Sequence, residues 1–254
     1  MADVKIWAHR GAGGWDKQYA PENTMPAFEK AIEMGADGIE LDVQFSRDGE
    51  IVICHDETID RTSNGSGAVR AYTLKELKQF NFCSVHPEFG FVEIPTLREV
   101  LEFMQDKDFH LNIELKTSNY DYSGLEETTS KLVKEYGLND RVIYSSFSYA
   151  SLKKLRQHDK KAHIAILCDK DFVLHEDIKE LKATAIHPWE QLVTEEKVKK
   201  WHDWGVKVNT WAVNNSLRML ELMQANRRGR NHYRLPGYRK IYNKKPPQRG
   251  EVKS

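Results

Sequence analysis

The chain has 254 residues, which is enough for one large domain with a well-buried core. Its apolar fraction of 40% and charged fraction of 30% are typical of a globular protein, and no apolar run is long enough to cross a membrane. The formal net charge of zero hides an asymmetry. Residues 227–254 hold ten of the 38 Lys and Arg residues and one of the 38 acids, so residues 1–226 hold 28 basic and 37 acidic groups.

The start of the chain and the cysteines give the expected compartment. The first residues, MADVKIWAHRG, lack the charged head, apolar stretch and cleavage site of a signal peptide, so we expect a cytoplasmic protein. The three cysteines, Cys54, Cys83 and Cys168, are odd in number and far apart, which predicts free thiols.

Short β-branched runs alternate with amphipathic stretches along most of the chain, which predicts an α/β fold with βα units around a parallel sheet. In chain order, strands are expected at 5–9, 38–43, 111–116, 142–147, 163–167, 184–188 and 207–213. Apolar residues recur at helical spacing over 24–35, 96–105, 148–159 and 195–205.

Residues 51–56 do not fit this alternation. Only SRDGE separates them from the preceding strand, and so short a link cannot join parallel neighbours. We predict a β-hairpin over 43–54, followed by a small insertion over 57–95. Seven parallel strands remain, one fewer than a closed (β/α)8 barrel needs.

Polar and charged residues gather at the carboxyl ends of the predicted strands. They are His9-Arg10, Glu40 and Asp42, His55-Asp56, Glu114 and Lys116, Ser145-Ser146, His187, and Trp211. In a parallel barrel these ends face one rim, where active sites are built. We therefore expect a site at this rim.

Three acids at this rim suggest a metal site. Glu40 and Asp42 are two apart and share a face of their strand, and Glu114 belongs to the next one. An all-oxygen set favours a hard ion, Mg²⁺ or Ca²⁺. The alternative is ordinary solvated acids paired with Arg or Lys. The apolar flanks in GIELDV and NIEL favour the metal site, because such acids are costly to place without a partner.

Histidines and basic residues complete the predicted chemistry. His9 and His55 each end an apolar run and are able to act as an acid–base pair near neutral pH, although a lone histidine is more often structural. Arg10 and Lys116 supply positive charge suited to a phosphate. Trp211 fits either a substrate wall or the barrel core.

Several motifs, in order and at consistent spacing, resemble the glycerophosphodiester phosphodiesterase family. They are AHRG (8–11), APENTMPAF (20–28), GADGIELDVQFSRDGEIVICHD (35–56), DRTSNGSG (60–67), IPTLREVL (94–101) and NIELK (112–116). The resemblance extends over about residues 4–217. No single motif is specific, but the series is.

This resemblance implies a TIM-type (β/α)8 barrel over residues 1–226 that hydrolyses glycerophosphodiesters to glycerol 3-phosphate and an alcohol. It implies a divalent cofactor, Mg²⁺ or Ca²⁺, and a small-molecule substrate rather than nucleic acid or an inserted membrane. Carried over by position, it gives His9 and His55 as general base and acid, Glu40, Asp42 and Glu114 as metal ligands, Arg10 and Lys116 as phosphate ligands, Glu22 as a supporting residue, and Trp211 and His187 as glycerol-pocket residues.

Other functions stay open at this stage. One is a catalytically impaired barrel that binds a ligand or interacts through its basic tail. Another is a lipid-directed, phospholipase D-like enzyme, although no apolar docking segment is present. The retained histidines and acids favour the phosphodiesterase.

The tail takes the place of the expected eighth strand. Members of the family typically continue after the Trp211 strand and its helix with a segment like GVDGIITDYPD, which is absent here. Residues 225–240, ANRRGRNHYRLPGYRK, are encodable so that deleting one cytosine after the Asn226 codon yields AN followed by GVDGIITDYPDIE. Third codon positions are free to vary, but the middle base of each codon is set by its amino acid and becomes the first base of the shifted codon. An arbitrary tail would therefore fail this test at some position. We therefore expect residues 227–254 to be a frameshifted readout and not a domain.

Two rival hypotheses explain the tail without a frameshift. One is a genuine basic arm for nucleic acid or anionic lipid, whose binding would be sensitive to salt. The other is an inert, disordered extension. The recoverable strand motif favours the frameshift over both.

Overall fold

The computed structural model describes residues 5–13, 19–215 and 217–222. Seven strands form one curled parallel sheet in the order β1-β2-β4-β5-β6-β7-β8. They are β1 (Trp7–Ala8), β2 (Gly38–Phe45), β4 (His110–Leu115), β5 (Val142–Ser146), β6 (His163–Cys168), β7 (Ala185–Pro188) and β8 (Lys207–Val208). The predicted α/β class and the parallel strand order of a TIM-type barrel are confirmed.

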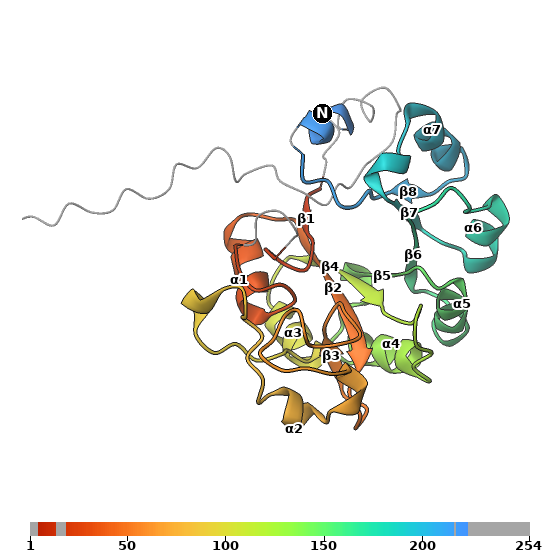
Figure 1. Cartoon of the computed structure of the whole chain (residues 1–254). Coiled ribbons are helices and arrows are strands. Elements are labelled where there is room, and N and C mark those ends of the chain that lie inside the picture. The colour runs from red at the N-terminus through yellow and green to blue at the C-terminus, as the bar shows by residue number, and fades with distance from the viewer. Residues whose placement is uncertain (1–4, 14–18, 216, 223–254) are drawn as a thin grey trace, which may run out of the picture.

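Helices cover the outer face of the curled sheet (Figure 1). They are α1 (Met25–Glu33), α3 (Leu97–Met104), α4 (Leu125–Glu135), α5 (Tyr149–His158), α6 (His175–Leu181) and α7 (Glu195–Asp203), with 3₁₀ turns at Asn139–Arg141 and Glu190–Leu192. The four helical stretches predicted from periodicity are all present.

The core lies between the sheet and these helices. On β2 the odd positions Ile39, Leu41 and Val43 are fully buried in the main apolar cluster. Helix α3 shows how its sequence sets its limits, because Thr96 and Glu99 form a capping box at its start and Leu97, Val100, Leu101 and Met104 form its buried face. With the odd residues of β2 directed to the helices, its even residues, Glu40 and Asp42, face the barrel interior.

The predicted hairpin and insertion are also present. Strand β3 (Ile51–Ile53) pairs antiparallel with β2, with Val43 opposite Ile53. Residues 57–95 contain η1 (Val69–Ala71), α2 (Leu74–Leu77) and η2 (Pro87–Phe89). They enclose a small second core formed by Val52, Cys54, Ile59, Val69, Leu77, Phe82 and Ile94. The three cysteines are free, as expected, and the structure shows that they are buried.

The two ends of the sheet do not pair with each other within the described residues. There β1 pairs with β2 alone, and β8 with β7 alone. Both strands have two residues, so the predicted ranges 5–9 and 207–213 were too long. Within the described residues each strand has a single neighbour to supply ladder hydrogen bonds, which explains why its regular part is so short. The predicted fate of residues 227–254 lies outside the described residues.

The described part of the chain contains no helix that is both long and apolar enough to cross a membrane. The compartment of the protein stays a prediction from the sequence.

Candidate active site

Three carboxylates meet on the neighbouring strands β2 and β4. Because β2 and β4 are parallel and in register, Asp42 lies opposite Glu114, with Glu40 two residues earlier on β2. One carboxylate oxygen from each of the three lies within 4.8 Å of the others, and all three residues are buried. The cluster predicted from strand spacing is therefore present.

Burial makes these carboxylates electrostatically unequal. It raises the pKa of Glu40 well above its ordinary value, and the charge on Asp42 adds to the effect. Burial also raises the pKa of Glu114. Burial alone would raise the pKa of Asp42 too, but Lys116, His55 and Arg10 outweigh it and lower that pKa to about 2. The ionised forms of Glu40 and Glu114 are therefore disfavoured unless further positive charge lies beside them.

The cluster suits a divalent cation. All its ligand atoms are carboxylate oxygens, which hard ions such as Mg²⁺ and Ca²⁺ prefer. Asp42 is fully buried, yet its Oδ1 makes no hydrogen bond within the described residues. Buried polar oxygens are normally satisfied, so this atom has capacity for a further ligand.

Arg10 and Lys116 lie beside the acids. Arg10 is buried, donates from its backbone nitrogen to Glu40 at 2.9 Å, and places its Nε 3.8 Å from Asp42. Lys116 Nζ lies 2.9 Å from Glu114 and 3.8 Å from Asp42. Both predicted phosphate-binding residues are therefore at the cluster.

The AHRG motif forms a strained turn at the end of β1. Arg10 has a φ of 53°, and Asn23, whose side chain donates to Asp42 at 2.8 Å, has a φ of 56°. Gly11 follows with a φ of +73°, and a Cβ there would lie 2.8 Å from the carbonyl carbon of Ala27. Left-handed backbone at two non-glycine residues is unfavourable and is often found at functional sites.

The two predicted catalytic histidines flank the cluster differently. His9 Nε2 lies 3.9 Å from Glu40, and burial, with Arg10 next in effect, lowers the pKa of His9 to about 3. His9 is therefore neutral near pH 7. His55 instead lies beside Asp56, with Nδ1 2.6 Å from Oδ1. This contact fixes the orientation of the His55 ring.

Glu22 is held in place by two arginines, Arg10 and Arg61, of which Arg61 is not among the predicted site residues. Its carboxylate accepts from Arg10 at 2.9 Å and from both terminal nitrogens of Arg61 at 2.7 and 2.8 Å. Arg61 also donates through Nε to Asp56 at 2.7 Å. It thus ties the insertion to the carboxylate that orients His55.

His187, on β7, and Trp211, in the segment after β8, form a separate group. His187 is buried, and its Nε2 lies 2.7 Å from the amide nitrogen of Asn209. Trp211 donates from Nε1 to the backbone oxygen of His187 at 2.8 Å and meets Phe147 edge to face at 5.5 Å. These contacts do not reach the acidic cluster, so the role of His187 in a glycerol pocket stays a prediction.

The burial of His187 leads to a pH-dependent prediction. Burial lowers its pKa to about 3, whereas an unfolded histidine titrates near 6.5. Between these values the unfolded chain binds the extra proton, so stability falls as the pH drops below 6.5. From pH 7.5 to 5.5, we expect His187 to lower the free energy of unfolding by about 1.4 kcal/mol. Melting curves at pH 7.5 and 5.5 should show a smaller loss of stability in His187→Gln, whose amide stays neutral, than in wild type. An equal loss of stability in both proteins would contradict the lowered pKa of His187.

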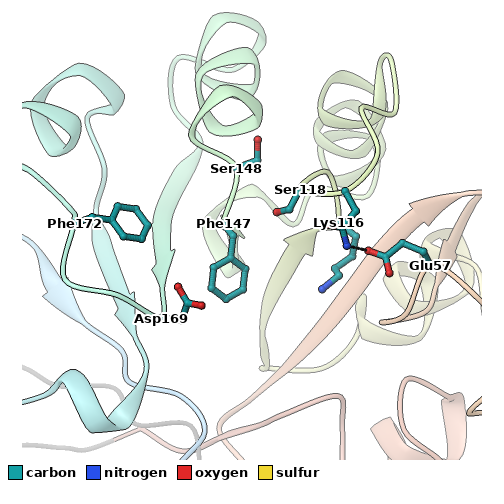
Figure 2. Close-up of a pocket in the computed structure, with 8 residues that line it drawn as sticks. Glu57, Lys116, Ser118, Phe147, Ser148, Asp169 and Phe172 are labelled. Carbon is teal, nitrogen blue, oxygen red and sulfur yellow. Dashed lines mark hydrogen bonds between the residues drawn. The ribbon is translucent and has the colours of Figure 1, made fainter.

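A cavity of about 510 Å³ opens next to Lys116. Its lining includes Phe147 after β5, Asp169 and Phe172 after β6, and Glu57 from the start of the insertion. Figure 2 shows the two phenylalanine rings on one side of this cavity and Lys116 with Glu57 on the other. Because Lys116 contacts both Glu114 and the cavity, this space adjoins the acidic cluster.

The sequence of the chain is similar to those of known proteins. The sequence profile of the "Glycerophosphoryl diester phosphodiesterase family" matches residues 9–229. The chain belongs to this family. A member from Caldanaerobacter subterraneus, named glycerophosphodiester phosphodiesterase, is 40% identical over 87% of this chain and 90% of its own length. One from Bacillus altitudinis with the same name is 44% identical over 73% of this chain and 75% of its own.

Solved structures of the family support the same fold. The structure of a phosphodiesterase from Oleispira antarctica, in complex with the product sn-glycerol-3-phosphate, covers 91% of this chain and 92% of its own, with a TM-score of 0.78 and 28% identity. A family enzyme from Agrobacterium tumefaciens covers 92% of this chain and 96% of its own, with a TM-score of 0.78 and 24% identity, and supports the fold alone.

Family membership confirms the resemblance drawn from the motifs, the TIM-type fold and the enzyme class. The chain is a phosphoric diester hydrolase of a family that hydrolyses glycerophosphodiesters.

Proposed function

We propose that this chain hydrolyses glycerophosphodiesters to glycerol 3-phosphate and an alcohol, using a divalent cation, Mg²⁺ or Ca²⁺, and two histidines. The observation that carries the proposal is the buried Glu40–Asp42–Glu114 cluster with His9, His55, Arg10 and Lys116 around it. The Oleispira antarctica relative, whose structure contains sn-glycerol-3-phosphate, supports a small phosphate ester as the ligand.

A bound cation would be held by Glu40, Asp42 and Glu114 and would supply positive charge to the phosphoryl oxygens. Arg10 and Lys116, both paired with these acids, provide further positive charge on the same side. Glu22 holds the Arg10 guanidinium through the 2.9 Å ion pair, so Arg10 has a fixed position. Charge that is already oriented before the reaction stabilises the transition state most effectively.

His9 is suited to the role of general base, because its lowered pKa leaves the imidazole neutral and able to accept a proton. It would take the proton of the attacking hydroxyl while the new P–O bond forms. His55 is suited to the role of general acid, because the 2.6 Å contact of its Nδ1 with Asp56 holds the ring in one orientation. It would give its proton to the departing alkoxide as the bond between phosphorus and the leaving oxygen breaks.

The roles of the two histidines are testable by substitution. We expect His9→Ala and His55→Ala each to lower kcat by about 10²- to 10⁴-fold, because each removes a proton-transfer group from the reaction. His158→Ala is the matched control, since His158 lies exposed on α5, where it pairs with Glu127. Full activity in either site variant would refute its role, and loss in the control would indicate general damage to the fold.

A further inference from the structure

We propose that Arg61 is a positioning residue for the general acid His55: it fixes the carboxylate of Asp56, which in turn holds the His55 ring. This inference rests on the proposed function and adds to it a residue on which protonation of the leaving alcohol depends. It is carried by the hydrogen bonds that the Arg61 guanidinium makes to two carboxylates.

The guanidinium of Arg61 joins Glu22 to Asp56. It donates through Nη1 and Nη2 to Glu22 at 2.7 and 2.8 Å. It also donates through Nε and Nη2 to Asp56 at 2.7 and 3.1 Å. Each pair has two parallel hydrogen bonds, which fix the orientation of a planar guanidinium as well as its position. Because Nη2 donates to both acids, the place of one carboxylate depends on the place of the other.

Glu22 is the fixed end of this arrangement. It is buried, and its Oε1 also accepts from Arg10 Nη1 at 2.9 Å. The side chain of Asp56 is more open, with 29% exposure. In the described part of the chain Asp56 makes three side-chain hydrogen bonds, and Arg61 supplies two of them. Loss of Arg61 would therefore leave Glu22 held by Arg10, but would free Asp56 to turn.

The orientation of Asp56 decides which nitrogen of His55 carries a proton. The hydrogen bond with His55, followed in effect by the pair with Arg61, lowers the pKa of Asp56, so its carboxylate is ionised near pH 7. An ionised carboxylate only accepts hydrogen bonds, so His55 Nδ1 must be the donor in the 2.6 Å contact with Asp56 Oδ1. Nε2 is then the His55 nitrogen left to exchange a proton with the leaving oxygen.

The loop that carries Arg61 is itself anchored. Ile59 is fully buried in the second core, and Ser84 donates from its hydroxyl to the backbone oxygen of Arg61 at 3.3 Å. The Arg61 side chain is 43% exposed, however, and ion pairs of exposed side chains contribute little to stability. We therefore expect loss of the guanidinium to affect the reaction much more than the fold.

The test compares two diesters whose leaving groups differ in basicity. Choline leaves as a basic alkoxide that needs a proton from a general acid, whereas 4-nitrophenolate leaves without one. We expect Arg61→Ala to lower kcat for glycerophosphocholine about 100-fold, with KM changed by less than about threefold, because the acid is misplaced and not removed. For the 4-nitrophenyl ester of glycerol 3-phosphate, kcat should fall by less than about threefold.

Two further measurements identify the missing group. Arg61→Lys keeps the charge but cannot form both two-bond pairs, so we expect it to lower kcat for glycerophosphocholine about tenfold. Free guanidinium ion, added below denaturing concentrations, should partly restore kcat in Arg61→Ala. The matched control is Arg47→Ala, because Arg47 is another exposed arginine that donates to Ala71 and Glu76 of the insertion. This control should keep the wild-type kcat for both diesters and show no response to guanidinium.

Two kinetic outcomes would overturn the inference. Equal losses of kcat for both diesters would mean that Arg61 serves the fold or the attacking step. A raised KM for both diesters at unchanged kcat would mean that Arg61 acts through Glu22 on Arg10. If Arg61→Ala does not fold, the same two comparisons with Arg61→Lys decide the question.

A measurement without turnover separates this inference from the proposed function. In alkaline buffer, where the ring is neutral, ¹⁵N spectra of His55 should show the proton on Nδ1 in wild type and on both nitrogens in turn in Arg61→Ala. Identical spectra would overturn the inference. If wild type hydrolyses no diester, the proposed function fails, whereas a difference between the spectra would still support the link from Arg61 to His55.

Discussion

Replacement of Asp42 by Asn is expected to lower kcat by about a thousandfold. Asp42 is fully buried and has the lowered pKa of a carboxylate that stays charged. Asparagine has the same shape and still accepts the hydrogen bond from Asn23, so the change removes mainly charge. The variant should also lose any rise in melting temperature that Mg²⁺ or Ca²⁺ gives to wild type, because it lacks one of the three carboxylate ligands.

The thermal readout distinguishes a damaged fold from a damaged metal site. Arg10 and Lys116 each keep a second acidic partner, Glu22 and Glu114, so we expect the variant to fold. Asp203→Asn is the control, because Asp203 lies exposed on α7, where it pairs with Lys199. A full metal-induced shift in Asp42→Asn would contradict the assignment of the cluster.

Replacement of residues 227–254 by GVDGIITDYPDIE is expected to raise the melting temperature by about 10 °C. We propose that these residues are a shifted reading of the closing strand, because one deleted base recovers this segment. Within the described residues, β1 and β8 each have one sheet neighbour, so a strand between them would supply the missing hydrogen bonds. Reduced aggregation of the restored chain should accompany the thermal shift.

A chain that ends at Asn226 is the control for this comparison. If the basic tail contributes nothing to folding, this shorter chain should melt like the original and below the restored one. Equal melting temperatures for the original and restored chains would refute the stability argument. Sequencing of the DNA around the Asn226 codon tests the frameshift itself, which fails if no frame encodes the strand.

The spacing of acids along the strands predicted the acidic cluster. A two-residue spacing within apolar flanks predicted that Glu40 and Asp42 share a buried face, and parallel order predicted that Glu114 lies near them. The register of β2 and β4 places Asp42 opposite Glu114. Periodicity suffices here because regular strands fix the direction of each side chain.

Contacts made by loops were not predictable in this way. Arg61 lies within the quoted motif DRTSNGSG, yet nothing local shows that it reaches Glu22, 39 residues earlier in the chain. Asn23 likewise belongs to APENTMPAF, but its bond to Asp42 depends on its left-handed backbone. Tertiary packing of the loops against the rim decides both contacts, and sequence periodicity carries no information about it.

The lengths of the outer strands were also beyond the sequence pattern. The apolar runs at 5–9 and 207–213 each contain a strand, but only Trp7–Ala8 and Lys207–Val208 form regular ladders. A ladder needs a partner as well as a suitable sequence. The residue pattern of one strand does not show whether a neighbouring strand is present to pair with it.

The metal-assisted mechanism is tested most directly by release of glycerol 3-phosphate from glycerophosphocholine by the purified chain, measured with and without a chelator. We expect steady release with Mg²⁺ or Ca²⁺, loss on chelation and recovery when the ion is restored in excess. Release that continues undiminished after complete removal of divalent ions would contradict the metal-assisted mechanism. No release under any ionic condition would contradict the proposed activity itself.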